Sequence, residues 1–406
     1  NKISSLHSPQ RGPLLELAIY SAQINSVETP LDLFSPSHYR SVRRPLLEAE
    51  TLPAACYTDP AFYAREVERL FAPQWELAGR IDEVPNPGDV IVLDSAAGST
   101  LVVRAADGEL RAFANSCRHR GTRLQDCSAN QSRLICPYHS WVFGLDGSLQ
   151  TAPGMQNAVG FSKEDFALEQ RRLDVWGGFI FVNQNADAPD LLCTLGNLPE
   201  VVRDHPLDAL RCTRRVEFDV ASNWKLLIEN ALEAYHTGTV HRATLGAQPS
   251  SPVDARGDWD ALYVPSDPDK SIATMPGELQ SFPFFANLQG MPAAGTFFTV
   301  LYPCTQIVFA QDCVWWMDIL PTAVDRSKVV LGSCFLDSVI AQPDFRERVE
   351  PYYHRWDSAT PEDNAIAEAQ QRGQAAGVKL RGRFSEREHC VHKLANWVLD
   401  RVLDTS

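Results

Sequence analysis

The stretch Cys117-Arg-His-Arg-Gly121, followed after fourteen intervening residues by Cys136-Pro-Tyr-His-Ser-Trp141, carries the strongest structural signal in this chain. It supplies two thiols and two imidazoles, as Cys117-x-His119 and Cys136-x-x-His139, with sixteen residues between His119 and Cys136. Short apolar runs and turn signals flank both pieces, so each is expected to form a loop between two β-strands. Two such loops can hold one metal centre between them.

Two kinds of metal centre use this set of ligands. Two Cys and two His bind structural zinc, but zinc sites usually place a Cys pair before a His pair. Here each loop contributes one Cys and one His, as in a Rieske [2Fe–2S] cluster, where Cys binds one iron and His the other. The pattern therefore predicts a Rieske cluster on Cys117, His119, Cys136 and His139. Tyr138 and Trp141 would shield it.

The surrounding chain suggests two domains. Between Trp75 and Asn183, short apolar runs alternate with turn signals, which predicts a small all-β domain. Before it, Asp59–Phe71 has helical periodicity, with Asp59-Pro60 as a cap and first-turn pair. After it, helix-like and strand-like segments mix. We place an N-terminal arm at 1–55, the Rieske domain with its lead-in helix at 56–187, and a larger α+β domain at 188–406.

Composition excludes several classes of protein. A chain of 406 residues with 44% apolar composition can bury a large core. Its net charge of −14 argues against a nucleic-acid or anionic-membrane partner. It lacks an apolar stretch near the roughly 20 residues of a membrane span and the order of a secretory signal, so we expect a cytoplasmic protein. Because the chain begins with Asn1, import into an organelle after loss of a targeting peptide is the alternative.

The cysteines do not form a disulfide framework. Ten are dispersed along the chain, and only Cys117 and Cys136 stand at metal-like spacing with histidines. The other eight are interpreted as small buried apolar residues.

A second group of candidate ligands follows a predicted helix whose N-cap would be Ser222. Glu233 and His236, three apart, would share a helix face. His236 and His241, five apart, would point about 140° away from each other on a continuous helix, and Gly238 offers a break that turns His241 back. With a carboxylate from elsewhere, the two histidines would bind a mononuclear Fe(II). An isolated pair would instead be ordinary polar residues at a helix end.

Taken together, the motifs resemble one family. The two cluster loops, then Asn223-Trp224-Lys225 and Glu233-x-x-His236-x₄-His241, are similar in order and separation to the alpha subunits of Rieske non-haem iron oxygenases, the ring-hydroxylating oxygenase family. The resemblance covers most of residues 57–400 and is strong at the motifs. It implies an α+β fold, with a small all-β Rieske domain and a larger, helix-grip-like catalytic domain built on an antiparallel sheet. It also implies hydroxylation of a small organic substrate with O₂.

The third iron ligand is expected in the C-terminal third. Thr360-Pro361-Glu362-Asp363 resembles the family helix whose acidic residue binds iron, and we choose Asp363, with Asp357 and Glu362 as alternatives. Without a metal, the same residues would start a helix, with Thr360 as N-cap and Pro361 at the first helical position.

The resemblance also implies a role for Glu233. In the family, subunits form a ring, a homotrimer or a multiple of it, and an acidic residue bridges the cluster of one subunit to the mononuclear iron of the next. Glu233 stands at that position, where most relatives have Asp. Together with Cys56-Tyr-Thr-Asp-Pro-x-Phe-Tyr63, it resembles the branch that oxidises carnitine, choline or glycine betaine.

The substrate expected from this branch is a quaternary ammonium compound that undergoes C–N cleavage or N-demethylation. Phe297-Phe298 and Trp315–Asp318 offer aromatic walls for such a cation, or simple core packing. One alternative is hydroxylation of an aromatic acid or ring, with a monooxygenase or dioxygenase outcome. Another is a Rieske electron carrier without oxygen chemistry, which would hold about two irons per chain instead of about three.

Electrons are expected from another protein. No Gly-x-Gly-x-x-Gly follows a predicted strand, so NAD(P)H would be used indirectly, through a separate reductase or ferredoxin. Positive charge near the cluster loops would form a docking patch for an acidic partner. The candidates are Arg118, Arg120, Arg123 and Arg133.

Overall fold

The computed structural model describes residues 32–267, 270–278, 282–378 and 382–403. Within these ranges the strands form three antiparallel sheets, two of seven strands and one of three. The first sheet has the strand order β1-β10-β9-β4-β3-β2-β5. Its strands are β1 (Glu76–Arg80), β2 (Asp89–Ser95), β3 (Gly98–Arg104), β4 (Leu110–Ala114), β5 (Ala129–Asn130), β9 (Gln170–Trp176) and β10 (Phe179–Asn183).

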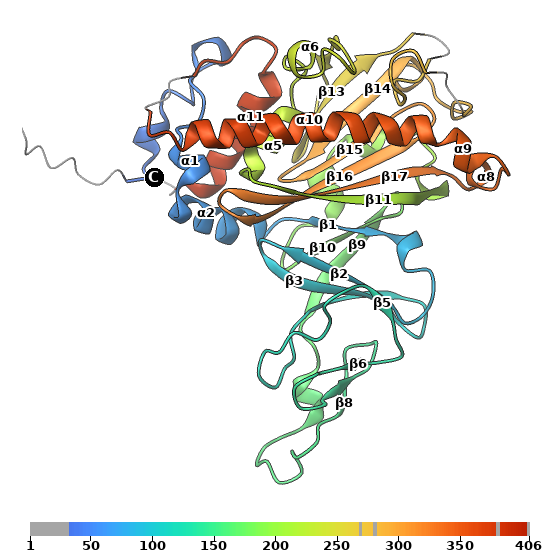
Figure 1. The fold of residues 1–406 in the computed structure, drawn as a ribbon. Coiled ribbons are helices and arrows are strands. Elements are labelled where there is room, and N and C mark those ends of the chain that lie inside the picture. Colours follow the sequence, from blue (N-terminus) through green and yellow to red (C-terminus); the bar gives the residue numbers. More distant parts are fainter. Residues whose placement is uncertain (1–31, 268–269, 279–281, 379–381, 404–406) are drawn as a thin grey trace, which may run out of the picture.

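The smallest sheet carries the second cluster loop. It consists of β6 (Leu134–Ile135), β7 (Val142–Phe143) and β8 (Leu149–Thr151). Its residues share a core with Cys117, Cys136 and Trp141. Figure 1 shows this sheet at the lower tip of the molecule, at the opposite end from the long C-terminal helices.

The second seven-stranded sheet has the order β11-β17-β16-β15-β14-β13-β12, in which β13 to β17 form a continuous meander. Its strands are β11 (Leu210–Val220), β12 (Ser251–Pro252), β13 (Trp259–Pro265), β14 (Gly295–Leu301), β15 (Thr305–Phe309), β16 (Val314–Ala323) and β17 (Arg326–Leu336). The helices that pack on it are α5 (Trp224–Ala231), α6 (Thr237–Val240), α10 (Glu350–Gln374) and α11 (His389–Val402). Figure 1 shows α10 running along this sheet. The α+β prediction with an antiparallel catalytic sheet is confirmed.

The remaining helical segments are short. They are η1 (Pro36–Tyr39), η2 (Leu46–Glu48), α1 (Ala55–Thr58), α2 (Pro60–Glu66), η3 (Val67–Phe71), η4 (Ile81–Glu83), η5 (Lys163–Phe166), α3 (Leu191–Leu195), α4 (Leu198–Val201), η6 (Leu207–Ala209), α7 (Met291–Ala294), α8 (Asp337–Ile340) and α9 (Phe345–Arg348). Among the helices in the described part of the chain, none combines the length and the apolar character needed to cross a membrane.

The lead-in helix begins as its sequence indicates. The carboxylate of Asp59 accepts a hydrogen bond from the N–H of Ala61 at 2.7 Å, which caps α2. The chain continues as one π-helical segment to Phe71. Phe62 and Phe71 are buried in a core shared with α5 and α11, and Phe71 packs edge-on against Trp224 at 5.3 Å between ring centroids. This helix therefore packs against the domain of the second sheet, whereas the sequence-based boundaries placed it with the first.

The predicted N-terminal arm can be followed only in part, because residues 1–31 lie outside the described residues. From residue 32 onward the segment lies on the body of the molecule, where Tyr39, Val42 and Leu52 are buried in the core around α11. The predicted domain boundary near residue 187 falls between β10 and β11.

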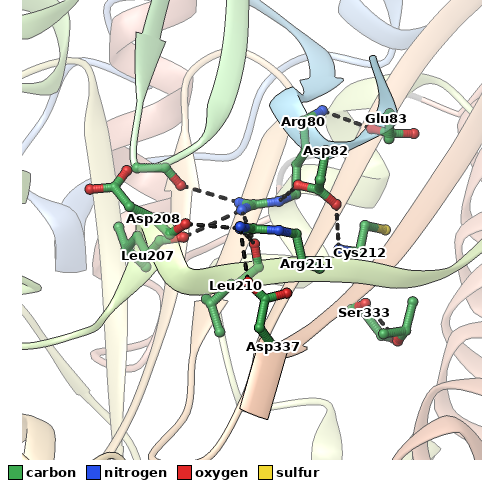
Figure 2. A network of polar contacts seen from close by, with 12 residues as sticks. Arg80, Asp82, Glu83, Leu207, Asp208, Leu210, Arg211, Cys212, Ser333 and Asp337 are labelled. Atoms are coloured by element: carbon green, nitrogen blue, oxygen red, sulfur yellow. Dashed lines mark hydrogen bonds and ion pairs between the residues drawn. The ribbon is translucent and has the colours of Figure 1, made fainter. Parts of the chain in front are cut away.

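A buried arginine joins the first sheet to the second (Figure 2). Arg80, at the end of β1, is fully buried and donates to Asp82 at 3.0 Å and to the carbonyl of Leu210 at 2.7 Å. Asp82 in turn accepts from the N–H of Cys212 in β11 at 2.7 Å. Gly178 makes room for this contact, because a Cβ there would lie 2.7 Å from a guanidinium nitrogen of Arg80. The charge is satisfied on both sides, so the network can hold the two sheets in one orientation.

The eight cysteines outside the cluster loops were predicted to be buried, and this holds for most of them. Five are buried: Cys56, Cys304, Cys313, Cys334 and Cys390. Cys212 is half-buried, while Cys127 and Cys193 are exposed, so the buried interpretation is wrong for these two. Both lie outside the regular strands, where apolar character alone does not ensure burial.

Candidate metal centres

The two cluster loops are built in the same way. The first joins β4 to β5, and the second joins β6 to β7. In each, the N–H of the cysteine donates to the carbonyl five residues later, Cys117 to Thr122 and Cys136 to Trp141, at 2.8 Å in both loops. The chain therefore turns back on itself and leaves both cysteine side chains inside the loops.

Each loop also needs one residue in the left-handed backbone region, four positions after the cysteine. In the first loop this residue is Gly121, with φ of 72°, and in the second it is Ser140, with φ of 57°. Ser140 is the single non-glycine residue with positive φ among the described residues. A side chain rarely adopts this conformation, and such residues cluster at functional sites.

The four predicted cluster ligands lie together. The thiols of Cys117 and Cys136 are buried and in contact, and the rings of His119 and His139 lie 4.7 Å apart at the half-exposed rim. Nδ1 of His119 is buried, and no hydrogen-bond partner for it exists in the described ranges. Two inner thiols and two outer imidazoles, one with a buried nitrogen lacking a partner, fit a Rieske [2Fe–2S] cluster.

The two aromatic residues of the second loop differ in exposure. Trp141 is buried and stacks on His119, with ring centroids 4.7 Å apart and an angle of 7° between the planes. Tyr138 lies against His139 at 3.7 Å, but 56% of its surface is exposed. Trp141 therefore shields the ligands more fully than Tyr138 does.

The second group of ligands is formed by His236, His241 and Asp363, whose candidate ligand atoms all lie within 4.8 Å of one another. Oδ1 of Asp363 is 3.1 Å from Nε2 of His241 and 3.5 Å from Nε2 of His236. Although it is buried, Oδ1 of Asp363 accepts no well-formed hydrogen bond from the part of the chain that is described. Two histidines and one carboxylate converging on one point fit a mononuclear non-haem Fe(II).

The chain reaches this geometry differently from the sequence-based expectation. The N-cap of α5 is Asn223, whose side chain accepts from the N–H of Lys225 at 3.0 Å, and not Ser222. The helix already ends after Ala231, so Glu233 and His236 do not lie on it.

The predicted break at Gly238 is also wrong, because Gly238 lies within the helical turn α6. The turn comes earlier, where the carboxylate of Glu233 accepts from the backbone N–H of Tyr235 and, at 3.0 Å, from that of His236. A polar side chain that bonds to its own backbone competes with helix continuation. Neither space nor backbone conformation requires a glycine at position 238, since a Cβ there would lie 3.4 Å from Cβ of Ala247, an ordinary van der Waals contact.

Asp363 lies in the middle of a helix. α10 begins at Glu350 and continues through Thr360, with Pro361 inside it, so the alternative in which Thr360 starts a helix is wrong. Pro361 has no N–H to donate to the carbonyl of Asp357. Asp357 itself is not at the site, because its carboxylate pairs with Arg214 at 2.9 Å.

Each candidate iron histidine has a carboxylate on its other ring nitrogen. Oε1 of Glu233 lies 2.6 Å from Nδ1 of His236, and Oε2 of Glu362 lies 2.7 Å from Nδ1 of His241. Glu362 also accepts from the hydroxyl of Thr244 at 2.7 Å. Such partners fix the tautomer and the ring orientation and leave Nε2 for a metal. Glu362, expected as an alternative ligand, therefore orients His241. The sequence could have indicated this role, because Glu362 stands next to Asp363. Adjacent residues of a helix point about 100° apart, so the two carboxylates are directed to different places.

A small cavity adjoins these residues. Its volume is about 90 Å³, several times the space that one water molecule needs. The wall is mostly apolar, with Leu262, Phe298, Met317 and Ile319 from the sheet. Helix α10 contributes polar groups, among them Arg355. This arrangement suits a small, largely apolar molecule with a polar end.

The predicted aromatic walls line the cavity only in part. Phe298 does so, whereas Phe297 and Trp316 are buried in the core between the two large sheets. Trp315 packs edge-on against Trp356, which does line the cavity, at 4.9 Å. Asp318 faces away from the cavity and accepts from Thr305 at 2.8 Å. Successive residues of a strand face opposite sides of the sheet, so Phe297 and Phe298 point in opposite directions, as do Trp315 and Trp316.

Comparison with known proteins agrees with both centres. The profile of the Rieske [2Fe–2S] domain matches residues 74–170, and that of the ring hydroxylating alpha subunit (catalytic domain) matches residues 207–404. The carnitine monooxygenase oxygenase subunit of Escherichia coli (strain K12) is 30% identical over 346 residues, which are 83% of this chain and 88% of that protein. The chain belongs to the Rieske ring-hydroxylating oxygenase family. Its cofactors are a Rieske cluster and a mononuclear iron, and the electron-carrier alternative does not hold because the catalytic domain is present.

Other Rieske oxygenases show the same relationship. The chloroplastic choline monooxygenase of Beta vulgaris is 29% identical over 88% of this chain and 78% of that protein. The crystal structure of the quaternary ammonium Rieske monooxygenase CntA with L-carnitine has a TM-score of 0.72 and 23% identity, covering 87% of this chain and 96% of that one. Naphthalene 1,2-dioxygenase with bound indole has a TM-score of 0.72 at 17% identity, covering 90% and 94%. The last two comparisons show that the fold is shared.

Proposed function

We propose that this Rieske oxygenase hydroxylates a quaternary ammonium compound at a carbon next to nitrogen, which leads to C–N cleavage or N-demethylation. The observation that carries the proposal is the opening of the His236, His241 and Asp363 group onto a small cavity walled by Phe298 and Trp356. Aromatic faces can hold a cation that has no hydrogen to donate. The names of the carnitine and choline monooxygenases among its relatives support the same class.

The reaction consumes one O₂, two electrons and two protons. One oxygen atom enters a C–H bond and the other leaves as water. When bound, the mononuclear iron activates O₂ and the Rieske cluster supplies an electron. The protein's own groups orient these centres: Glu233 and Glu362 hold the two histidine rings through Nδ1, and the apolar cavity wall limits the water around the substrate.

The ligand assignment is part of this proposal. We assign the cluster to Cys117, His119, Cys136 and His139, and the mononuclear iron to His236, His241 and Asp363. Cys136→Ser should abolish the visible and EPR signature of the cluster. Asp363→Ala should lower the iron content from about three to about two per chain while the cluster stays reducible. A Cys136→Ser protein with a normal spectrum, or an Asp363→Ala protein with full iron and turnover, would contradict the assignment.

The position of the cluster loops supports the proposal that electrons pass between subunits. Figure 1 shows the sheet that carries the second loop far from α5 and α10. Within the described residues, the Glu233 carboxylate contacts Tyr235 and His236 and does not contact a cluster ligand. We infer that Glu233 links His236 to His139 of a neighbouring subunit in a homotrimer or a multiple of it. A quaternary ammonium Rieske monooxygenase of this fold is reported to use inter-subunit electron transfer.

External electrons would come from NAD(P)H through a separate reductase or ferredoxin. Arg118, Arg120 and Arg133 are exposed beside the cluster loops and suit an acidic partner. Arg123 is less available than its sequence position indicates, because it is half-buried and pairs with Asp94 at 2.7 Å.

The proposal is tested by turnover with O₂ and a surrogate reductase on betaines, choline and aromatic acids. A quaternary ammonium substrate should give a demethylated or cleaved amine, with aldehyde formed in equal amount and matched by O₂ consumption. Ring-hydroxylated products from aromatic acids alone would favour the second candidate, aromatic hydroxylation. That candidate is supported by the same apolar cavity wall.

A further inference from the structure

Arg355 is a buried cation without an ion pair or hydrogen bond to any described residue, and its guanidinium carbon lies 5.9 Å from the ring centroid of Trp356. The arginine lies on α10, is 2% exposed and lines the cavity beside the candidate iron ligands. Its Nε is buried without a hydrogen bond, and no ion pair or hydrogen bond of its guanidinium is found in the described ranges. Buried charges in folded proteins are ordinarily paired, because desolvation without compensation is costly. An unpaired guanidinium at a cavity wall therefore indicates a missing anion.

The nearby carboxylates are already engaged. Asp312 accepts from Tyr352 at 2.5 Å and from Ser271 at 2.7 Å. Asp363 faces the two candidate iron histidines. Burial lowers the pKa of Arg355 to about 10, so the side chain still carries its charge at neutral pH. Among the described residues, therefore, no carboxylate forms an ion pair with Arg355, and the charge of Asp363 acts on it without a direct contact.

Two further hydrogen-bond donors on the same helix also lack acceptors. Nε1 of Trp356 and Oγ1 of Thr360 are buried, line the cavity region and have no hydrogen-bond partner among the residues that the structure describes. A Trp N–H can only donate, and a guanidinium can only donate. Buried donors left without acceptors cost free energy, so an acceptor-rich ligand group is expected here.

We propose that the substrate carries a carboxylate and that Arg355 binds it. This deepens the proposed function, on which it rests for the ammonium part: the substrate is a betaine, with both charges, and not an amino alcohol without a carboxylate. Arg355 and Asp363 are eight residues apart, about 12 Å along the axis of an α-helix. The carboxylate is thereby held away from the iron ligands, and the rest of the substrate extends along the apolar wall towards them.

The same geometry disfavours a purely cationic substrate. A choline-like molecule would bring a positive charge into a small cavity that already contains an unpaired guanidinium, and this repulsion is strong where water is scarce. A betaine adds one charge of each sign, and its carboxylate compensates Arg355. The ring of Phe298 remains available for the ammonium group, whereas the ring of Trp356 already faces the guanidinium carbon of Arg355 at 5.9 Å from its centroid.

The test is anaerobic titration calorimetry on the iron-loaded holoenzyme with four probes. Glycine betaine and carnitine carry both groups, choline lacks the carboxylate, and tert-butylacetate has carbon in place of the ammonium nitrogen. Arg355→Met should weaken binding of the three carboxylates by about 10- to 100-fold and leave choline binding unchanged or tighter. Arg355→Lys should recover part of the loss. Arg372→Met, an exposed position on the same helix, should change nothing.

A structural role for Arg355 gives a different pattern. Because the guanidinium of Arg355 forms no ion pair or hydrogen bond with the described residues, Arg355→Met should unfold at the same temperature as the wild type or higher. Equal weakening for choline and glycine betaine, or no weakening, would overturn the proposal. So would a wild type that binds choline as tightly as the carboxylates, or that binds no carboxylate. If tert-butylacetate binds through Arg355 as tightly as glycine betaine, the carboxylate inference stands and the quaternary ammonium function fails.

Discussion

Glu362 accepts a hydrogen bond from His241, with Oε2 lying 2.7 Å from Nδ1. The two residues are 121 positions apart in the chain, and their contact joins α10 to the segment after α6. It matches the contact of Glu233 with His236, at 2.6 Å. The neutral tautomer of each ring is therefore set with Nε2 unprotonated, which is the form that binds a metal.

The first prediction concerns this contact. Glu362→Gln should weaken affinity for the mononuclear iron by about 10- to 100-fold, because His241 loses its charged partner. The cluster should be unaffected. Iron titration of the depleted protein, with the cluster EPR signal as internal reference, measures both. Glu347→Gln on the exposed surface of α9 is the control, and equal iron affinity in the two variants would show that Glu362 has no such role.

The second prediction separates the two acidic partners. Glu233→Gln should weaken iron affinity as Glu362→Gln does, because His236 loses its charged partner. Once it is loaded at a saturating iron concentration, it should keep both iron centres and the ring assembly and yet lose most turnover, because the link between His236 and the neighbouring cluster is broken. The measurement is single-turnover oxidation of the reduced cluster with O₂ and substrate. The variant should reduce normally and then fail to discharge, and Glu233→Asp should recover part of the rate. Discharge at the wild-type rate in the Gln variant would remove Glu233 from the electron path.

The third prediction concerns the docking of the reductase. Charge reversal at the exposed Arg118 and Arg133 should raise the KM for the reductase several-fold and reduce its dependence on salt, because charges at the rim of an interface act mainly on association. Arg326→Glu, exposed at the start of β17, is the matched control. Reductase kinetics that do not change in the double reversal would locate the docking surface elsewhere.

The fourth prediction concerns pH. Burial raises the pKa of Asp318 to about 7, against the opposing effects of a hydrogen bond from Thr305 and the charge of Arg215. Since the folded pKa lies above the unfolded one, near 4, this group destabilises the fold progressively as pH rises from about 4 to about 7, by up to about 1.4 kcal/mol per pH unit. Asp318→Asn should remove this slope.

The unfolding temperature of Asp318→Asn relative to the wild type, followed from pH 4 to 8, checks the prediction. The difference should grow in favour of the variant up to about pH 7 and then level off. The neighbouring Glu76, whose pKa burial raises to about 8, titrates with the same sign in both proteins. Asp325→Asn, in the exposed turn after β16, is the control, and a constant difference between Asp318→Asn and the wild type would contradict the expectation.

The sequence predicted the parts of the site that short segments determine. The second cluster loop is a short turn between β6 and β7, so Cys136 and His139 could be paired from their spacing alone. The end of α5 could not be placed correctly, because it depends on the carboxylate of Glu233 bonding to the following backbone. Spacing alone favoured a break at Gly238.

Arg355 shows a second limit. In the sequence it stands between His354 and Trp356, next to both polar and aromatic residues, and it is not among the residues predicted for the site. Its burial depends on which face of α10 meets the sheet, and that is decided by tertiary packing of residues such as Tyr352 and Trp356. The spacing of apolar residues identifies the buried face of a helix, but it does not indicate that one charged residue lies on that face.

Helix α10 carries Arg355, Trp356, Glu362 and Asp363 within nine consecutive positions. An insertion or deletion of one residue in this segment would rotate everything beyond it by about 100° and shift it by about 1.5 Å. The substrate contact and the iron ligand could not then both keep their places. Over evolutionary time, the length of this segment should therefore be held constant, and substrate preference can change there only by exchange of side chains at fixed positions.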